Sequence, residues 1–302
     1  MILLTGAAGK TGKAVIAALA KKAVRVRAFV RRDEHVAGLK ALGAAECVAG
    51  SFEDDGALRR AAAGACAIYH ICPNVCPHEV AYARAVAAAA RARGVRRFVY
   101  HSVLHPQIEA MPHHWQKMRA EEMLLASGLD LTILQPTAYM QNILGALPGV
   151  IGEGVFRVPY PVTTRLSLVD VADVAEAASI VLTEGGHGGA TYELAGTEPL
   201  SQTEVAAAIG AALNRPVRAE AETVESWQAR ARTAGMGEHE CATLAAMFRY
   251  YAVHGLIGNA HVLAALLGRK PNDLAAFLRR STAHDPQKKL ASHRSFPSCT
   301  RR

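Results

Sequence analysis

The sequence predicts an α/β protein built around a doubly wound, parallel sheet. Short apolar runs alternate with helical patterns along most of the 302 residues, and the first run passes through a glycine-rich turn straight into a helix. No apolar stretch is long enough to span a membrane. We expect a main domain over residues 1–200, with sheet segments continuing to residue 223, then a mainly helical lobe over 201–282 and a basic, disordered tail over 283–302.

The first twelve residues carry the strongest motif. Met1 to Leu4 is an apolar strand, and Gly6-Ala-Ala-Gly9-Lys-Thr-Gly12 leads from it into a helix. Gly6 permits the tight turn, Gly9 lets backbone approach a pyrophosphate, and Gly12 lets the helix pack close to the strand. The free N–H groups at the helix start favour phosphate, although an ordinary glycine-rich turn is the alternative. The cofactor contacts predicted in this turn are Gly6, Ala8, Gly9, Lys10, Thr11 and Gly12.

The second predicted strand, Ala23 to Val30, ends in Arg31-Arg32-Asp33. In a dinucleotide-binding fold, an acidic residue at this strand end binds the adenine ribose 2′-hydroxyl. Arginine stands here instead, and a guanidinium can pair with a 2′-phosphate. The pattern therefore favours NADP over NAD, with Arg31 as the first choice and Arg32 as the second. The alternative is that both arginines lie on a solvated loop.

Alternation of strands and helices continues toward the middle of the chain. Predicted strands cover residues 46–49, 67–71, 97–101 and 130–135, and predicted helices cover 55–63 and 78–93. Ser51 and Phe52 follow the third strand and are expected to flank adenine. Ile71, Cys72 and Pro73 end the fourth strand and are expected near the nicotinamide side.

Polar groups follow the fifth strand. Ser102 stands at its carboxyl end, where open α/β sheets bind ligands. Pro112 suits the first turn of a helix, and His113 and Lys117 lie four residues apart on one face of that helix. These two side chains can therefore act on one ligand.

These motifs, taken in order, resemble the NmrA-like branch of the atypical short-chain dehydrogenase/reductases. The resemblance runs from Leu3 to about Arg280. It is carried by the glycine turn, the strand-end Arg31, His101-Ser102-Val-Leu-His105-Pro106, Lys117, Ser127 to Pro136, Tyr139-Met-Gln-Asn142, Val169 to Val174 and Leu266 to Pro271. It implies a Rossmann-type fold. Pro136, Thr137 and Tyr139, at and after the sixth strand, are further expected cofactor contacts, and His105, Tyr139 and Asn142 are expected substrate contacts, although Tyr139 and Asn142 could simply pack the helix. Trp227 of the helical lobe is a candidate for the acceptor pocket, with packing in the core as the alternative.

The resemblance also implies a chemistry. Short-chain reductases use a serine, a tyrosine that protonates the substrate oxygen, and a lysine that binds the nicotinamide ribose. Ser102 and Lys117 match two of these groups, and His113 takes the place of the tyrosine. The expected catalytic residues are Ser102, His113 and Lys117, since a neutral imidazole can still donate a proton.

The resemblance thus favours an NADP(H)-dependent reductase of a conjugated acceptor such as a quinone or enone. A regulatory protein that senses NADP(H) and binds a partner protein is the alternative. A redox-neutral isomerase or lyase that retains its nucleotide is a third possibility.

The composition and charge of the sequence indicate which kinds of binding partner to expect. Much of the net charge of +8 lies in the tail, and no basic stripe interleaved with aromatic residues stands out, so we expect no nucleic acid. The six cysteines are expected to be free thiols of a cytoplasmic protein, and Cys72-Pro-Asn-Val-Cys76 fits neither a redox pair nor a zinc site. No metal is expected, because the histidines lack ligand spacing. The expected partner is a small-molecule acceptor, with a homodimer possible.

Overall fold

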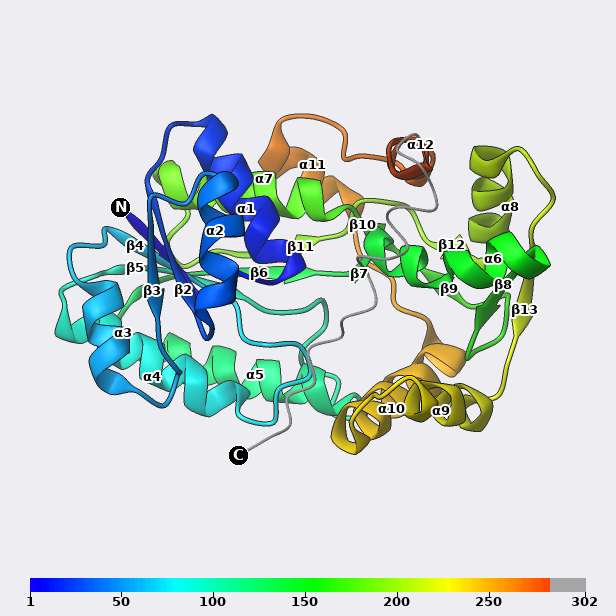
Figure 1. The fold of residues 1–302 in the computed structure, drawn as a ribbon, viewed down its shortest axis with the longest axis horizontal. Coiled ribbons are helices and arrows are strands. Elements are labelled where there is room, and N and C mark those ends of the chain that lie inside the picture. Colours follow the sequence, from blue (N-terminus) through cyan, green and yellow to red (C-terminus); the bar gives the residue numbers. More distant parts are fainter. Residues whose placement is uncertain (283–302) are drawn as a thin grey trace.

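A seven-stranded parallel sheet forms the centre of the computed structural model, which describes residues 1–282 (Figure 1). Its strand order is β11-β6-β5-β4-β1-β2-β3, so the order reverses between β1 and β4. The fold class predicted from sequence is confirmed. The strands are β1 (Ile2–Leu4), β2 (Val26–Val30), β3 (Glu46–Ala49), β4 (Ala67–His70), β5 (Arg97–His101), β6 (Asp130–Pro136) and β11 (Thr191–Leu194).

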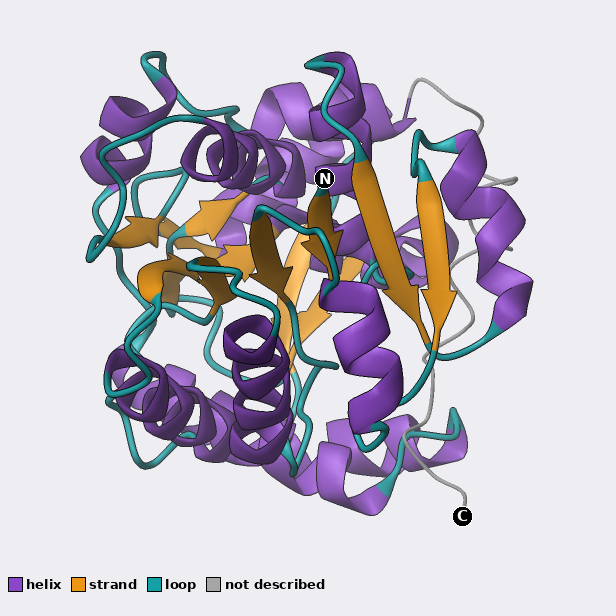
Figure 2. Ribbon diagram, turned by 90° about the vertical axis from the view of Figure 1, so that its left-hand side faces the viewer, coloured by secondary structure: helices purple, strands orange, loops and turns teal. Residues whose placement is uncertain are grey.

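Helices cover both faces of this sheet, and Figure 2 shows the strands running between them. One face carries α1 (Lys10–Lys21), α2 (Val36–Ala41), α7 (Val171–Thr183) and α11 (Ala260–Leu267). The other carries α3 (Asp55–Ala62), α4 (Glu79–Ala92) and α5 (Pro112–Leu125). Each face buries its own apolar cluster.

A third apolar cluster holds a lobe beyond the carboxyl ends of the strands (Figure 1). Its helical elements are η2 (Met140–Ala146), α6 (Leu147–Glu153), α8 (Gln202–Leu213), α9 (Val224–Thr233), α10 (Glu238–His254) and α12 (Leu274–Thr282). Three short strand pairs join them: β8 (Val155–Val158) with β13 (Arg218–Ala221), β9 (Arg165–Leu166) with β12 (Leu200–Ser201), and β10 (Leu168–Val169) with β7 (Ala138–Tyr139).

The apolar clusters of the sheet region and of the lobe draw on interleaved segments of the chain. The predicted helical lobe over 201–282 includes α11, but Leu263 of α11 belongs to the core beneath α1 and α7. In the other direction, α6 and β8 come from the predicted main domain and pack in the lobe. The predicted tail, 283–302, lies outside the described residues.

Local sequence signals set several helix ends. Pro112 occupies the first turn of α5, and Ser201 with Glu204 forms the capping box that begins α8. The Asp54 side chain accepts from the Ala57 N–H and caps α3. Four short helical elements were not predicted from the sequence: η1 (Asp33–His35), α2, η2 and α6. All four are seven residues or shorter, so they give little periodic signal.

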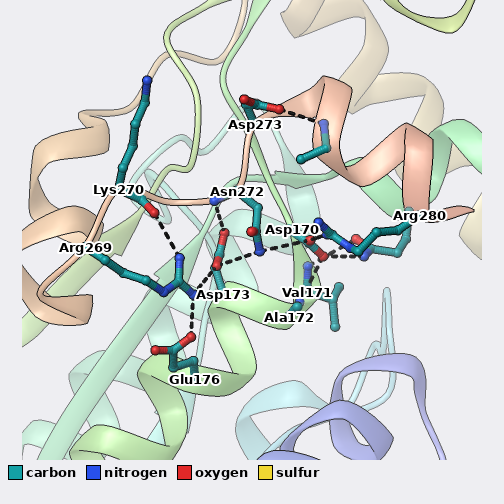
Figure 3. A network of polar contacts seen from close by, with 12 residues as sticks. Asp170, Val171, Ala172, Asp173, Glu176, Arg269, Lys270, Asn272, Asp273 and Arg280 are labelled. Atoms are coloured by element: carbon teal, nitrogen blue, oxygen red, sulfur yellow. Dashed lines mark hydrogen bonds and ion pairs between the residues drawn. The ribbon is translucent and has the colours of Figure 1, made fainter. Parts of the chain in front are cut away.

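A buried acidic cluster ties the last helix to α7 (Figure 3). Asp170 is 1% exposed and Asp173 is 0% exposed, at the start of α7. Arg280 of α12 pairs with Asp170, and Arg269 Nη2 donates to Asp173 Oδ1 at 2.7 Å. Asn272 N and Nδ2 also donate to Asp173, at 2.7 and 2.8 Å. The segment 269–280 is therefore anchored beside the sheet.

Candidate functional site

The β1–α1 loop forms a close-packed cradle at the point where the strand order reverses. Gly6 has φ +63°, and a Cβ on it would come within 2.6 Å of the Ile71 carbonyl oxygen at the end of β4. A Cβ on Gly12 would come within 2.5 Å of the Gly6 carbonyl oxygen. Gly9 is exposed, and its Cβ would meet only the Gly6 oxygen, at 3.2 Å. Gly6 and Gly12 thus serve packing, while Gly9 leaves the outer side of the loop open.

The start of α1 suits a diphosphate. Gly9 is the N-cap, no side chain caps the helix, and no acidic residue lies in its first turn. The first N–H groups are therefore available to an anion, and the helix dipole favours negative charge there. Lys10 Nζ donates to Asn142 Oδ1 at 3.3 Å, so the cradle touches η2 of the lobe.

The two predicted 2′-phosphate ligands differ in their surroundings. Both Arg31 and Arg32 are exposed at the end of β2. Arg32 Nη1 lies 3.1 Å from Glu34 Oε1, which neutralises its charge locally. Within residues 1–282, Arg31 has neither a hydrogen bond nor an ion pair. Arg31 is therefore the guanidinium free to receive an anion.

The residues predicted around adenine and at the end of β4 lie at the same edge of the sheet. Phe52 stacks on Tyr82 with ring centroids 4.9 Å apart, and Ser51 Oγ accepts from the Glu53 N–H. Ile71 is half-buried and Pro73 exposed. Cys72 is 6% exposed, and burial raises the pKa of its thiol. The Ser51–Phe52 corner and the Pro73 turn thus remain accessible from outside.

Lys117 is fixed by two acceptors in the floor of the site. Its Nζ donates to Glu79 Oε1 and to the His101 carbonyl oxygen, each at 2.9 Å. The Tyr100 hydroxyl donates to the same Glu79 oxygen at 2.7 Å, and Lys117 Nζ lies 5.1 Å from the centre of the Tyr100 ring. The ammonium is therefore held at the end of β5 with a buried counter-charge.

Ser102, a predicted catalytic residue, lies in the interior of the fold. Its side chain is buried, at 1% exposure, and its hydroxyl donates to Glu121 on α5. Gln135 Nε2 donates to both Glu121 oxygens at 3.0 and 3.1 Å, and burial raises the pKa of Glu121. Ser102 therefore belongs to an internal network that joins the end of β5 to β6 and α5.

His113 lies one turn before Lys117 on α5, as predicted, but its surroundings disfavour a charged ring. Burial, aided by the neighbouring His114 and Lys117, lowers the pKa of His113 to about 3. Its buried Nδ1 has no hydrogen-bond partner among residues 1–282. The ring is neutral at pH 7, so it can donate a hydrogen bond but holds no readily transferred proton.

Tyr139 takes part in a chain of hydrogen bonds that the sequence did not reveal. The His101 ring lies between two tyrosine hydroxyls, with Nε2 2.7 Å from Tyr139 Oη and Nδ1 2.6 Å from Tyr69 Oη. Thr11 Oγ1, in the first turn of α1, donates to Tyr139 Oη at 3.3 Å. Burial lowers the pKa of His101 to about 3 and raises that of Tyr139 to about 12. This series of hydrogen bonds leads from Thr11, beside the glycine cradle, to the buried Tyr69.

Four other predicted contacts are directed elsewhere. His105 Nε2 lies 2.8 Å from the Ile257 carbonyl oxygen, and the ring turns toward the 255–259 loop. The Thr137 hydroxyl donates to the Ser167 carbonyl oxygen at 2.8 Å, and Pro136 is buried at the end of β6. Trp227 packs edge-on against Phe248 in the lobe, with centroids 4.7 Å apart. The side chains of His105, Thr137 and Trp227 are therefore engaged by other parts of the fold.

The residues missed by sequence reasoning are Glu79, Tyr69 and the ring of His101. Tyr69 and His101 stand at or beside the carboxyl ends of β4 and β5. The same strand-end rule that selected Ser102 would have found them. Glu79 is the first residue of α4, where an acidic side chain is common because it interacts favourably with the helix dipole. Nothing in the sequence therefore marks it as the partner of Lys117.

Comparison with known proteins supplies the family. The profile of the NmrA-like family matches residues 1–278. This chain belongs to the NmrA-like family. The membership confirms the resemblance expected from the motifs.

Relatives of this NmrA-like protein include named reductases. It is 31% identical over 288 residues to an NAD(P)H azoreductase of Xenophilus azovorans, covering 94% of this chain and 98% of the relative. It is 36% identical over 242 residues to a (4-alkanoyl-5-oxo-2,5-dihydrofuran-3-yl)methyl phosphate reductase of Streptomyces griseus, covering 79% and 82%. A crystal structure of the Escherichia coli NADPH-dependent quinone oxidoreductase QOR2 complexed with NADPH matches with TM-score 0.84 and 28% identity, covering 93% of this chain and 100% of that one.

Proposed function

We propose that this chain is an NADPH-dependent reductase that transfers hydride to a small conjugated carbonyl compound, such as a quinone or enone. The observation that carries the proposal is the position of Lys117. Its ammonium is fixed by Glu79 and the His101 carbonyl at the end of β5, two strands along the sheet from β1, whose following loop forms the cradle of Gly6, Gly9 and Gly12. Lysine at this place is the group with which short-chain reductases hold the nicotinamide ribose.

The described residues fit NADPH along the edge of the sheet. Gly9 and the uncapped start of α1 would receive the diphosphate, and the unpaired Arg31 would receive the 2′-phosphate. The Ser51–Phe52 corner would border adenine, and Lys117 would donate to the ribose hydroxyls. When bound, the reduced nicotinamide supplies the hydride, while the protein supplies orientation and electrostatics.

The choice of acceptor follows from the relatives. One is named for reducing a dihydrofuranone that carries an alkanoyl group, and another for reducing quinones. Both names describe carbonyl groups conjugated with a carbon–carbon double bond, which accept hydride at carbon and a proton at oxygen. We therefore place this chain among reductases of conjugated carbonyl compounds.

Two measurements test the proposal. Calorimetric titration should show tighter binding of NADPH than of NADH, and the absorbance of reduced nicotinamide should fall when members of a quinone and enone panel are added. Lys117→Met should weaken NADPH binding and lower turnover, whereas Lys40→Met, an exposed lysine on α2, should change neither. No heat with either nucleotide would contradict the proposal.

One observation favours a second function. His113, at the position of the missing tyrosine, is neutral and lacks a partner at Nδ1 within residues 1–282. A protein that binds NADP(H) and regulates a partner protein would need no proton donor there. Tight NADPH binding without turnover on any acceptor of the panel would support this sensor and exclude the reductase.

A further inference from the structure

The hydrogen bonds of Tyr69, His101 and Tyr139 have a preferred direction. Tyr69 is 0% exposed, and among residues 1–282 its hydroxyl has only the His101 ring as a partner. If His101 carried its proton on Nδ1, Tyr69 would accept and its own O–H would be buried without an acceptor. An unsatisfied buried donor costs about 1–3 kcal/mol.

The opposite arrangement satisfies every interior group. Tyr69 donates to Nδ1, and the neutral His101 ring carries its proton on Nε2 and donates to Tyr139 Oη. Thr11 donates to the same oxygen, so both lone pairs of the Tyr139 hydroxyl are occupied. Its O–H hydrogen is then the one donor of the chain left without an acceptor. Because Tyr139 is half-buried, that hydrogen can point to a ligand.

The place of this free donor matches the reaction. Tyr139 Oη is one hydrogen bond from Thr11, in the helix turn beside the diphosphate cradle. It is also bonded to the ring of His101, whose carbonyl oxygen holds Lys117. The Tyr139 hydroxyl therefore lies between the diphosphate cradle and Lys117, the two predicted cofactor contacts, where the nicotinamide half of NADPH would bind.

We infer that Tyr139 donates the proton that accompanies hydride transfer, in place of the tyrosine that His113 replaces, with His101 and Tyr69 as positioning residues. The inference rests on the proposed function. It gives the reductase a proton donor on β7 instead of α5, and it assigns His101 a role through its tautomer.

With an enone, hydride transfer and protonation use both ends of the conjugated system. Hydride forms a C–H bond at the β-carbon, the electron pair of the double bond moves through to the carbonyl oxygen, and that oxygen takes the Tyr139 proton. The acceptor gains two electrons, and the nicotinamide loses them. The resulting Tyr139 phenolate accepts hydrogen bonds from Thr11 Oγ1 and His101 Nε2, and water returns a proton to it after the product leaves.

Two acceptors separate proton donation from other roles of the hydroxyl. An enone needs hydride and a proton, whereas a triarylmethyl cation dye is neutralised by hydride alone. For Tyr139→Phe, we expect kcat with the enone to fall about 100-fold or more, with kcat for the dye and the Kd for NADPH unchanged. Tyr192→Phe is the matched control, because Tyr192 Oη lies 2.8 Å from His187 Nδ1 in a similar pair on β11. An unchanged enone kcat, an equal fall with both acceptors, or a change confined to NADPH affinity would each overturn the inference.

The tautomer of His101 can be measured by NMR, which tests the inference independently of catalytic turnover. Long-range ¹H–¹⁵N spectra of the full chain with NADPH should show His101 protonated on Nε2 and bare on Nδ1 at neutral pH. The Nε2 resonance should shift in Tyr139→Phe and stay in Tyr192→Phe. A proton on Nδ1 would overturn the inference even if the chain reduces both acceptors. A wild type that reduces neither acceptor would instead contradict the proposed function.

Discussion

Lys117 Nζ and Glu79 Oε1 lie 2.9 Å apart, and with side chains only 11% and 3% exposed they form an almost fully buried ion pair. Removing one member of such a pair leaves an uncompensated charge. We expect Glu79→Ala to lower the free energy of unfolding by about 3–5 kcal/mol. Urea denaturation measures this, with Glu184→Ala as the control because Glu184 forms an exposed pair with Lys22. A loss no larger than that of the control would refute the assignment.

Arg31 should decide the choice between the two nicotinamide nucleotides. Its guanidinium is exposed and unpaired within the described residues, whereas Arg32 is paired with Glu34. Charged hydrogen bonds contribute about 1.5–3 kcal/mol, so Arg31→Ala should weaken NADPH binding by about 10- to 150-fold. NADH affinity should stay unchanged, and Arg32→Ala should have a much smaller effect. Equal losses for both nucleotides would mean that Arg31 does not meet the 2′-phosphate.

Gly12 is predicted to tolerate no side chain. An added Cβ would lie 2.5 Å from the Gly6 carbonyl oxygen and 2.7 Å from the Ala7 Cα, which are backbone atoms that cannot easily move. Gly12→Ala should therefore lower the midpoint of thermal unfolding and weaken NADPH binding. Gly38→Ala on α2 is the control, since nothing lies within 4 Å of its Cβ and alanine favours helix. A Gly12→Ala protein as stable as wild type would contradict the close packing.

Four buried histidines should make the protein sensitive to mild acid. Burial lowers the pKa of His70, His101 and His113 to about 3 and that of His114 to about 4. The unfolded chain takes up protons on these rings below pH 6.5 or so, and the native state does not. Stability is therefore complete above that pH and falls toward pH 4, by up to about 1.4 kcal/mol per pH unit for each ring.

Urea titrations between pH 7 and pH 5 measure that slope. His70→Gln removes one titrating ring, so the slope of unfolding free energy against pH should fall by the contribution of one bound proton. His254→Gln, at an exposed position on α10, should leave it unchanged. An unfolding free energy independent of pH over this range would show that these rings are accessible to protons in the native state.

The sequence anticipated the parts of the site whose signals are local. The Gly6–Gly12 spacing, the Arg31 strand end and the His113–Lys117 helix face depend on neighbours in the chain, and each lies where the pattern predicts. The role of Ser102 depended on what packs across from it, and Glu121 and Gln135 come from other elements. Long-range partners of this kind leave no periodic trace, so the Glu79–Lys117 pair could not be predicted. The strand-end rule points to Tyr69 and His101, but their hydrogen bonds, which extend to Tyr139, could not be predicted.

The ion pairs that join Asp170 and Asp173 to the 269–280 segment affect the thermal unfolding of the protein. Helix α12 packs on α8 of the lobe, whereas the two carboxylates stand at the start of α7, which covers one face of the central sheet. Separating the lobe from the sheet region would leave the buried carboxylates of Asp170 and Asp173 without their arginine partners. We therefore expect neither region to unfold independently of the other. Heating should give one sharp calorimetric peak, and a chain shortened before Asn272 should lose cooperativity throughout, far from the cut.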